Sequence, residues 1–160
     1  MLKQFYPYFA LFIIVLMADQ ISKIYLNNFL VYGESFYLFP GADLLLVYNT
    51  GAAFGILSEQ SGWQRWFLSA ISIVISILLI FWIKVAVNYS KIESFSLTAI
   101  LAGAMGNLID RLLYGYVIDF IHLYWGEFSW PNFNVADSSI TFGAVLLIYS
   151  QVVSGKSKLN

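Results

Sequence analysis

The chain has 160 residues, of which 60% are hydrophobic and only 11% are charged. A soluble domain carries roughly 25% charged residues, so this composition argues against a soluble globule or a disordered chain and is typical of a membrane protein. The net charge of −1 without a basic run gives no indication of nucleic-acid binding, and the lack of cysteine excludes disulfides, thiol nucleophiles and thiolate metal sites.

Four apolar stretches approach the length of about 20 residues that a helix needs to cross a bilayer. They cover about residues 8–26, 66–87, 95–113 and 138–153. We therefore predict an all-α membrane protein with four transmembrane helices, in which residues 1–160 form a single integral-membrane domain.

The long connection between the first two spans, about residues 27–65, is predicted to hold a small extracytoplasmic β-sheet. Its first part is rich in β-branched and aromatic residues and is punctuated by Gly33 and Pro40-Gly41, which indicates two or three strands. Residues 52–64 are predicted to form a short interfacial helix. The next outer connection, residues 114–137, carries rings that favour the water–lipid boundary: Tyr124, Trp125, Phe128, Trp130 and Phe133.

The distribution of lysine and arginine predicts the orientation, because these residues are enriched in cytoplasmic loops. With a cytoplasmic N-terminus, the inner side holds Lys3, Lys84, Lys91, Lys156 and Lys158. The outer side then holds Lys23, Arg65 and Arg111. We expect a multi-pass protein with both termini in the cytoplasm.

This topology brings the unusual polar residues of the spans to one membrane face. The outer ends of spans one, three and four carry Asp19, Lys23, Asn107, Asp110, Arg111 and Asp137. Polar side chains are expensive inside a membrane and mark functional sites there. Their convergence predicts a site at the outer face.

Asp19 and Lys23 are four residues apart on a helix, in the favoured order for an ion pair. Two interpretations remain open. The pair either neutralises itself while the lysine reaches for the lipid headgroups, or it supports the site.

The third span carries small residues at a spacing of four, which lets helices approach closely. Two stripes end in polar side chains: Ala99, Gly103, Asn107 and Ala102, Gly106, Asp110. Close approach would bury Asn107 and Asp110, so they need partners. Arg111 is the obvious partner for Asp110 or another nearby acid.

Asp119 and Asp137 have no lysine or arginine within four positions. If the two carboxyl groups meet, they cannot both ionise cheaply, and one pKa must rise. Two carboxylates that share a proton are the catalytic pair of an aspartic protease. A small ion or proton carrier and a non-enzymatic assembly subunit remain alternatives, and no role is assigned to His122.

Five motifs together resemble the lipoprotein signal peptidases, also called signal peptidase II. In chain order they are DQISK (19–23), NTGAAFG (49–55), GAMGNLIDR (103–111), VIDF (117–120) and FNVADSS (133–139). The resemblance covers almost the whole chain, and five motifs in the family's order make it highly specific.

The resemblance implies a membrane aspartic endopeptidase that removes the signal peptide from prolipoproteins, cleaving before a diacylglyceryl-modified cysteine without a metal or cofactor. It places the catalytic pair on Asp119 and Asp137. It places supporting residues on Asp19, Lys23, Asn49, Gly51, Asn107, Asp110, Arg111, Asn134 and Ala136.

The resemblance also implies the setting of the protein. We expect a monomer in the bacterial plasma membrane, with its active site at the outer face and no nucleic acid bound. Its expected partners are prolipoprotein substrates, membrane lipids and globomycin-type inhibitors.

Overall fold

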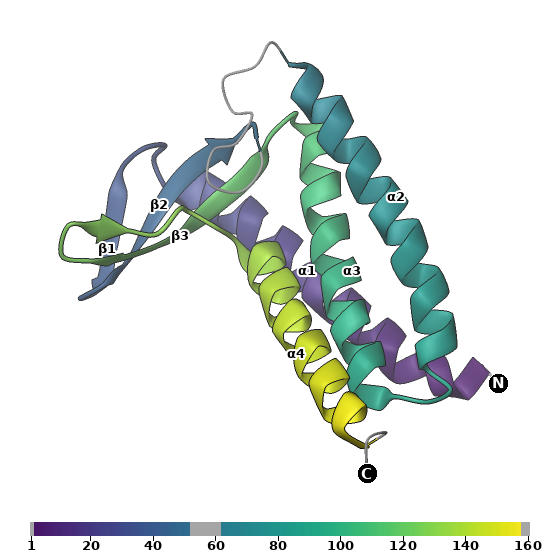
Figure 1. Cartoon of the computed structure of the whole chain (residues 1–160). Helices are drawn as coiled ribbons and strands as arrows, with labels where there is room; N and C mark the ends of the chain where they lie inside the picture. Colours follow the sequence, from purple (N-terminus) through teal and green to yellow (C-terminus); the bar gives the residue numbers. More distant parts are fainter. Residues whose placement is uncertain (1, 52–61, 158–160) are drawn as a thin grey trace.

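The computed structural model describes residues 2–51 and 62–157. Within this part of the chain, four long helices run side by side and a small sheet projects from one end of the bundle (Figure 1). A 3-10 turn, η1 (Leu2–Phe5), leads into the first helix. The helices are α1 (Tyr6–Phe29), α2 (Trp63–Ala86), α3 (Lys91–Leu113) and α4 (Val135–Ser157).

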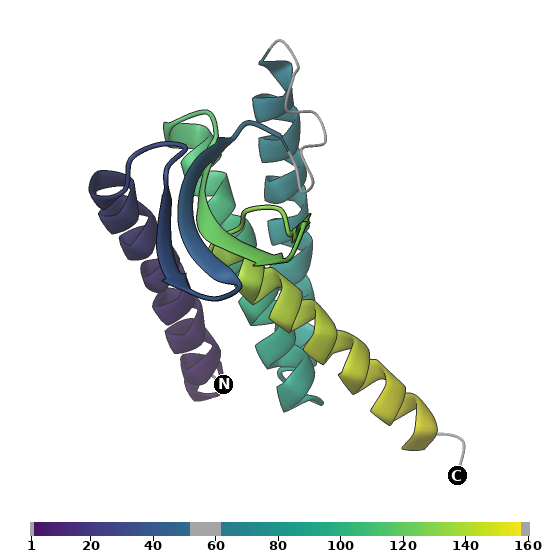
Figure 2. The ribbon, with the colours of Figure 1, turned by 90° about the vertical axis from the view of Figure 1, so that its left-hand side faces the viewer.

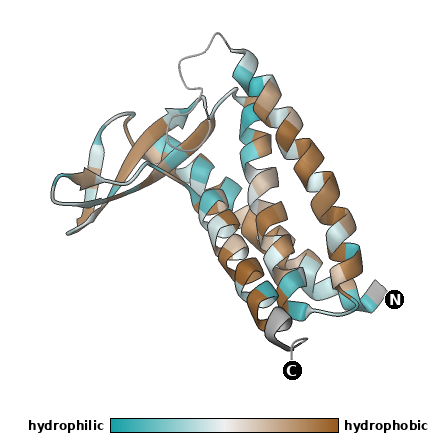
Figure 3. Ribbon diagram, viewed as in Figure 1, coloured by the Kyte–Doolittle hydropathy of each residue, from teal (hydrophilic) through white to brown (hydrophobic). Residues whose placement is uncertain are grey.

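All four helices are long and apolar enough to cross a membrane, which confirms the four predicted spans. Figure 3 shows the hydrophobic colour along the middle of the helices and more hydrophilic segments where they reach the sheet. The helix ends lie within four residues of the predicted ones. The difference that concerns the polar residues is the start of α4, which begins at Val135 rather than near residue 138.

Helix α3 lies at the centre of the bundle and packs against the other three helices. In the candidate membrane span of α3, 67% of the residues are buried. In each of the other three spans, at most 22% are buried. The exposed apolar surfaces of α1, α2 and α4 are therefore the lipid-facing surfaces of the molecule.

Two glycines of α3 allow α1 and α4 to approach it closely, as the small-residue stripes predict. A side chain at Gly103 would collide with the backbone carbonyl of Ala136 and with Ser139 on α4. A side chain at Gly106 would collide with the carboxylate of Asp19 on α1. The start of α4 and the middle of α1 thus meet on the same face of α3.

The sheet contains four antiparallel strands in the order β1-β2-β3-β4. Strands β1 (Ser35–Phe39) and β2 (Ala42–Asn49) come from the connection between α1 and α2 and confirm that strands form there. Strands β3 (Val117–Trp125) and β4 (Phe128–Ser129) come from the connection between α3 and α4, where no strand was predicted. Asp119 therefore lies on a strand.

A small hydrophobic core fastens the sheet to the C-terminal end of α1. Leu46, Ile118 and Phe120 are buried there, and Leu26 and Leu30 pack against them. The strands curve over the ends of the helices (Figure 2). This packing holds the first half of β3 above the start of α4.

The predicted interfacial helix at residues 52–64 falls mainly on residues 52–61, which lie outside the described residues. Its last predicted residues, Trp63 and Gln64, form the start of α2.

We predict that Gly103→Ala destabilises the protein, because the added methyl group must displace the backbone of Ala136. Overpacking of this kind costs about 1–3 kcal/mol. Thermal unfolding in detergent should show a lower midpoint than in the parent. Ala10→Val, at an exposed position of α1, is the matched control and should leave the midpoint unchanged. An unchanged midpoint for Gly103→Ala would contradict the close α3–α4 contact.

Candidate active site

Lys23 occupies the centre of a buried polar cluster between α1 and α3. Its ammonium group lies 2.9 Å from a carboxylate oxygen of Asp19 and 2.9 Å from one of Asp110, and it donates a 3.0 Å hydrogen bond to Asn107 Oδ1. At most 1% of the side chain of Lys23, Asp19 or Asp110 is exposed. The predicted Asp19–Lys23 ion pair is confirmed, and Lys23 points into the site rather than toward the headgroups.

The two acids that pair with Lys23 each hold the backbone of another element. Asp19 Oδ1 accepts a 2.8 Å hydrogen bond from the N–H of Ala136, in the first turn of α4. The first N–H groups of a helix have no partner within it, so this contact satisfies one of them. Asp110 Oδ2 accepts a 3.1 Å hydrogen bond from the N–H of Ile118 on β3.

These two contacts fix the backbone of the residue that precedes each lone aspartate in the sequence. Ala136 precedes Asp137, and Ile118 precedes Asp119. The buried charges of α1 and α3 therefore fix the backbone positions from which Asp119 and Asp137 extend.

Asn107 connects Lys23 to Asp137. Because an ammonium group can only donate hydrogen bonds, the carbonyl oxygen of the Asn107 side chain faces Lys23. Its amide nitrogen consequently faces Asp137 and donates a 2.8 Å hydrogen bond to Oδ1. The charge of Lys23 thus sets the orientation of the amide that contacts the carboxylate.

Asn134 contacts both lone aspartates from a completely buried position. Its side-chain amide donates to Asp119 Oδ1 at 2.6 Å and to Asn107 Oδ1 at 3.2 Å. Its backbone N–H donates to Asp137 Oδ2 at 3.2 Å, and its Oδ1 accepts from the Asp137 N–H at 2.9 Å. This reciprocal pair is a capping box that starts α4.

Asp119, the second lone aspartate, lies on β3 and is 2% exposed. Its second oxygen accepts a 3.0 Å hydrogen bond from the side-chain amide of Asn49 on β2. Burial, and next the negative charge of Asp137, raise the pKa of Asp119 to about 7, against the smaller lowering effects of Asn49, Asn134 and Lys23. The carboxyl group is thus poised to gain or lose a proton near neutral pH.

Gly51 and Arg111 complete the set of predicted residues. The N–H of Gly51 donates to Asn49 Oδ1 at 3.0 Å, which orients the Asn49 amide toward Asp119. Arg111 donates to the carbonyl of Gly51 at 3.3 Å. Arg111 was expected to pair with Asp110 or with another nearby acid. The first of these two options is wrong, because Lys23 is the ion-pair partner of Asp110.

Asp119 and Asp137 line one cavity of about 920 Å³ at the junction of the sheet and the helices. Asn49, Asn107 and Arg111 also line it. The structure thus brings the eleven residues singled out in the sequence into one connected network, in which the two carboxyl groups border the open space.

Comparisons with known proteins identify the family of the chain. The family model of signal peptidase (SPase) II matches residues 11–153. The lipoprotein signal peptidase of Burkholderia thailandensis is 44% identical over 146 residues, which are 91% of this chain and 87% of the relative. That of Burkholderia multivorans is 46% identical over the same shares. The chain belongs to the signal peptidase II family.

Solved structures support the same conclusion for the fold. One, described as a bacterial membrane enzyme at 2.3 Å resolution, superposes with a TM-score of 0.84 at 34% identity and covers 95% of this chain and 91% of its own. Another, at 1.9 Å, has a TM-score of 0.76 at 31% identity and covers 91% and 92%. As a member of the signal peptidase II family, the protein is a protease with four membrane spans.

One residue of this signal peptidase II cluster was not identified from the sequence. The side-chain amide of Gln20 lies 3.1 Å from Asp19 Oδ2, 3.1 Å from Asp110 Oδ1 and 3.2 Å from the carbonyl of Gly106. It shares the two acids with Lys23. A polar residue beside Asp19 within an apolar span was the available signal.

We predict that Lys23→Met destabilises this signal peptidase II, because it leaves Asp19 and Asp110 buried without a cation. Removing one partner of a buried ion pair costs about 3–5 kcal/mol. The midpoint of thermal unfolding in detergent should fall well below that of the parent.

The triple variant Lys23→Met, Asp19→Asn, Asp110→Asn is the matched control, because it removes the stranded charges as well. It should regain much of the lost stability. If Lys23→Met alone unfolded at the parent temperature, the cluster would not be held together by the Lys23 charge.

Proposed function

We propose that this signal peptidase II is an aspartic endopeptidase that uses Asp119 and Asp137 to remove the signal peptide from prolipoproteins, cleaving before a diacylglyceryl-modified cysteine. The names of the curated relatives support the lipoprotein substrate. The observation that carries the proposal is that two carboxyl groups, the buried Asp119 and the half-buried Asp137, share Asn134 and one cavity. Among the described residues, no cation lies within ion-pair distance of either group.

The charge balance supports a shared proton. The network contains four acids, Asp19, Asp110, Asp119 and Asp137, but only two cations, Lys23 and Arg111. Lys23 is already paired with the first two acids. One proton between Asp119 and Asp137 reduces the uncompensated negative charge in a site that is largely removed from water.

The surroundings of the two carboxyl groups support one resting state of the pair. Asp137 lies in the first turn of α4, where the helix dipole favours a negative charge. Asp119 lies on a strand and has a pKa of about 7. Asp137 is therefore the ionised base at rest and Asp119 the protonated acid, although the two titrate as a coupled unit.

The reaction then proceeds by acid–base catalysis on a water molecule. Asp137 takes a proton from the water as the water oxygen attacks the scissile carbonyl carbon. Asp119 donates its proton to the carbonyl oxygen as the tetrahedral intermediate forms. The proton on Asp137 passes to the amide nitrogen as the C–N bond breaks, and the intermediate's hydroxyl proton returns to Asp119 as the carboxylic acid product forms.

The cavity offers a place for the lipid part of the substrate. Besides the two carboxyl groups, Phe142 and Val145 of α4 line it, and both are exposed on the lipid-facing surface of the span. A diacylglyceryl group lying along this flank of α4 would remain in hydrocarbon while its cysteine reached Asp137. Such anchoring removes much of the entropic cost of orienting the scissile bond.

Further features of the proposal follow from the family resemblance. We expect a cytoplasmic location of both termini, an active site at the outer face of the bacterial plasma membrane, a monomeric state, inhibition by globomycin-type peptides and independence from metals and cofactors. The lysine and arginine distribution supports the orientation.

The ion-carrier alternative has less support than the protease. A carrier needs polar groups that can bind an ion on both halves of the spans. The inner half of α3 does hold buried hydroxyls, but those of Ser94, Ser96 and Thr98 each donate to a carbonyl four residues earlier. These hydroxyl protons are therefore already engaged in hydrogen bonds at the same helix. The family, in addition, is one of proteases.

We predict that Asp119→Asn and Asp137→Asn each reduce cleavage of a diacylglyceryl prolipoprotein by at least about 100-fold, the lower range of general acid–base contributions. The substrate's mass before and after incubation in lipid micelles measures cleavage. Asp43→Asn is the matched control, because Asp43 lies on β2 outside the cavity lining.

Size-exclusion chromatography and thermal unfolding should show that the variants remain folded. Activity of either variant within a few-fold of the parent would overturn the catalytic pair. Loss of activity in Asp43→Asn as well would point to a general effect of sheet substitutions.

A further inference from the structure

The outer sheet has one apolar face and one polar face beyond its contact with α1. Paired residues in neighbouring strands point to the same face. The apolar face holds the rows Phe36–Leu44–Ile121, Phe39–Ala42–Leu123 and Trp125–Phe128. The polar face holds the rows Tyr37–Asp43–His122 and Tyr124–Ser129.

The polar face is internally hydrogen-bonded. Ser35 donates to Asp43 Oδ2 at 2.5 Å, and His122 Nε2 lies 2.7 Å from the hydroxyl of Ser129. His122 Nδ1 lies 3.9 Å from Asp43. This face is suited to water.

The apolar face exposes several large aromatic side chains, and their contact with water is unfavourable. The exposed fractions are 48% for Phe36, 59% for Phe39, 88% for Trp125 and 62% for Phe128. Edge strand β1 is exposed along its whole length. Exposed apolar surfaces of this kind mark sites of interaction.

The direction of the apolar face is fixed by Asp119. Residues two apart on a strand share a face, so Asp119 lies on the same face as Ile121, Leu123 and Trp125. Asp119 meets Asn134 at the start of α4, and α4 runs from there through the bundle (Figure 1). The apolar face therefore looks toward the side on which the spans enter the membrane.

The apolar face is also continuous with the lipid-facing surface of the spans at two places. The cavity wall joins Trp130 and Phe133, beside the sheet, to Phe142 and Val145 of α4. At the other edge, the ring of Phe36 lies 5.7 Å from that of Phe29 on α1, measured between centroids. Phe29 is 54% exposed on the outer end of that span.

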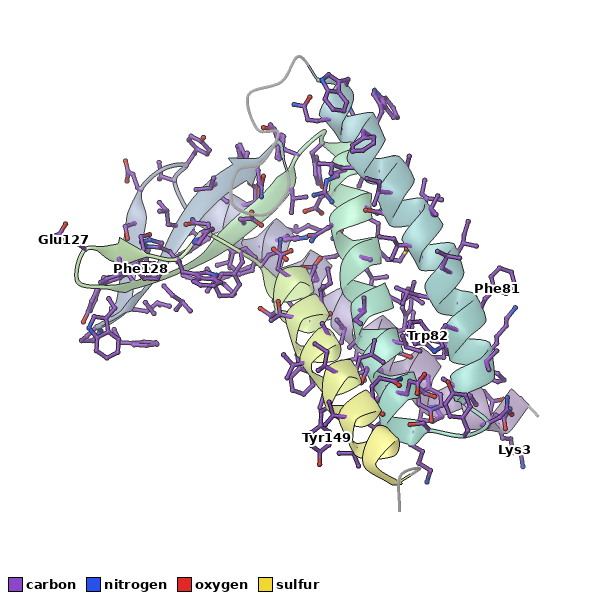
Figure 4. The ribbon with its side chains drawn as sticks, viewed as in Figure 1. Lys3, Phe81, Trp82, Glu127, Phe128 and Tyr149 are labelled. Carbon is purple, nitrogen blue, oxygen red and sulfur yellow. The ribbon has the colours of Figure 1, made fainter. Side chains whose placement is uncertain are left out.

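We propose that the apolar face of the sheet rests on the outer leaflet of the membrane, with the rings of Phe36, Phe39, Trp125 and Phe128 among the lipid headgroups and upper acyl chains. Aromatic rings favour this zone. Figure 4 labels Glu127 and Phe128 at the end of the sheet farthest from the helices, so the contact reaches well beyond the bundle.

The charges of the sheet indicate which lipids it contacts. Residues 27–50 and 114–134 contain no lysine or arginine, and the turns carry Glu34 and Glu127. The contact is therefore made by burial of rings and does not need anionic lipid.

Fluorescence of single tryptophans tests the proposal without reference to catalysis. Trp63, Trp66, Trp82 and Trp130 are replaced by phenylalanine, leaving Trp125 on the apolar face. The matched control carries Tyr37→Trp on the polar face with Trp125 also replaced; Tyr37 is 61% exposed. Both proteins are reconstituted without substrate in phosphatidylcholine bilayers with brominated acyl chains.

We expect brominated lipid to quench Trp125 at least about twofold more than the Tyr37→Trp reporter, and aqueous iodide to quench them in the opposite order. Adding phosphatidylglycerol should leave the Trp125 result unchanged. Phe128→Trp provides a second reporter on the apolar face if the Trp125 protein folds poorly. Equal iodide quenching on both faces, or lipid quenching that requires phosphatidylglycerol, would overturn the proposal.

Discussion

The buried ammonium group of Lys23 is the constraint on which the junction of the sheet and the helices depends. A charge removed from water must be paired and hydrogen-bonded, and Lys23 has partners for all three of its protons: Asp19, Asp110 and Asn107. These partners come from two different helices. The cation therefore holds α1 against α3, where Gly106 leaves the space for the Asp19 carboxylate.

The same cluster positions the elements that carry the two lone aspartates. Asp19 binds the N–H before Asp137, and Asp110 binds the N–H before Asp119. Asn107 and Asn134 then contact the carboxyl groups themselves. Because these donors are held by packing and by other hydrogen bonds, the two carboxyl groups are preorganised. Groups on helices and strands are positioned more accurately than groups on loops.

Much of the fold could be predicted from the sequence, because membrane spans are marked by length and hydropathy alone. Strand β3 could not, since Val117–Phe120 are buried on both faces and therefore lack the alternation that marks a strand. The early start of α4 did have a local signal, the Asn134 to Asp137 capping box.

The candidate site was predictable in its members more than in its contacts. Motifs that resemble those of a family identified the residues. The ion-pair partner of Asp110, however, depends on which helices pack together, and that partner is Lys23 rather than Arg111. Gln20 was missed for the same reason. Contacts between side chains of different helices depend on how the helices pack in the folded protein.

We propose that this network holds Asp119 and Asp137 as a pair that shares one proton. The most direct measurement is a pH titration followed by infrared difference spectroscopy of the protonated carboxyl band, compared with Asp119→Asn. Since the pKa of Asp119 is raised to about 7, one carboxyl group should remain protonated below that pH and lose its proton as the pH rises through it. This band should be missing in the variant. A parent protein without a carboxyl group that titrates near neutral pH, or a variant with the same band, would contradict the account.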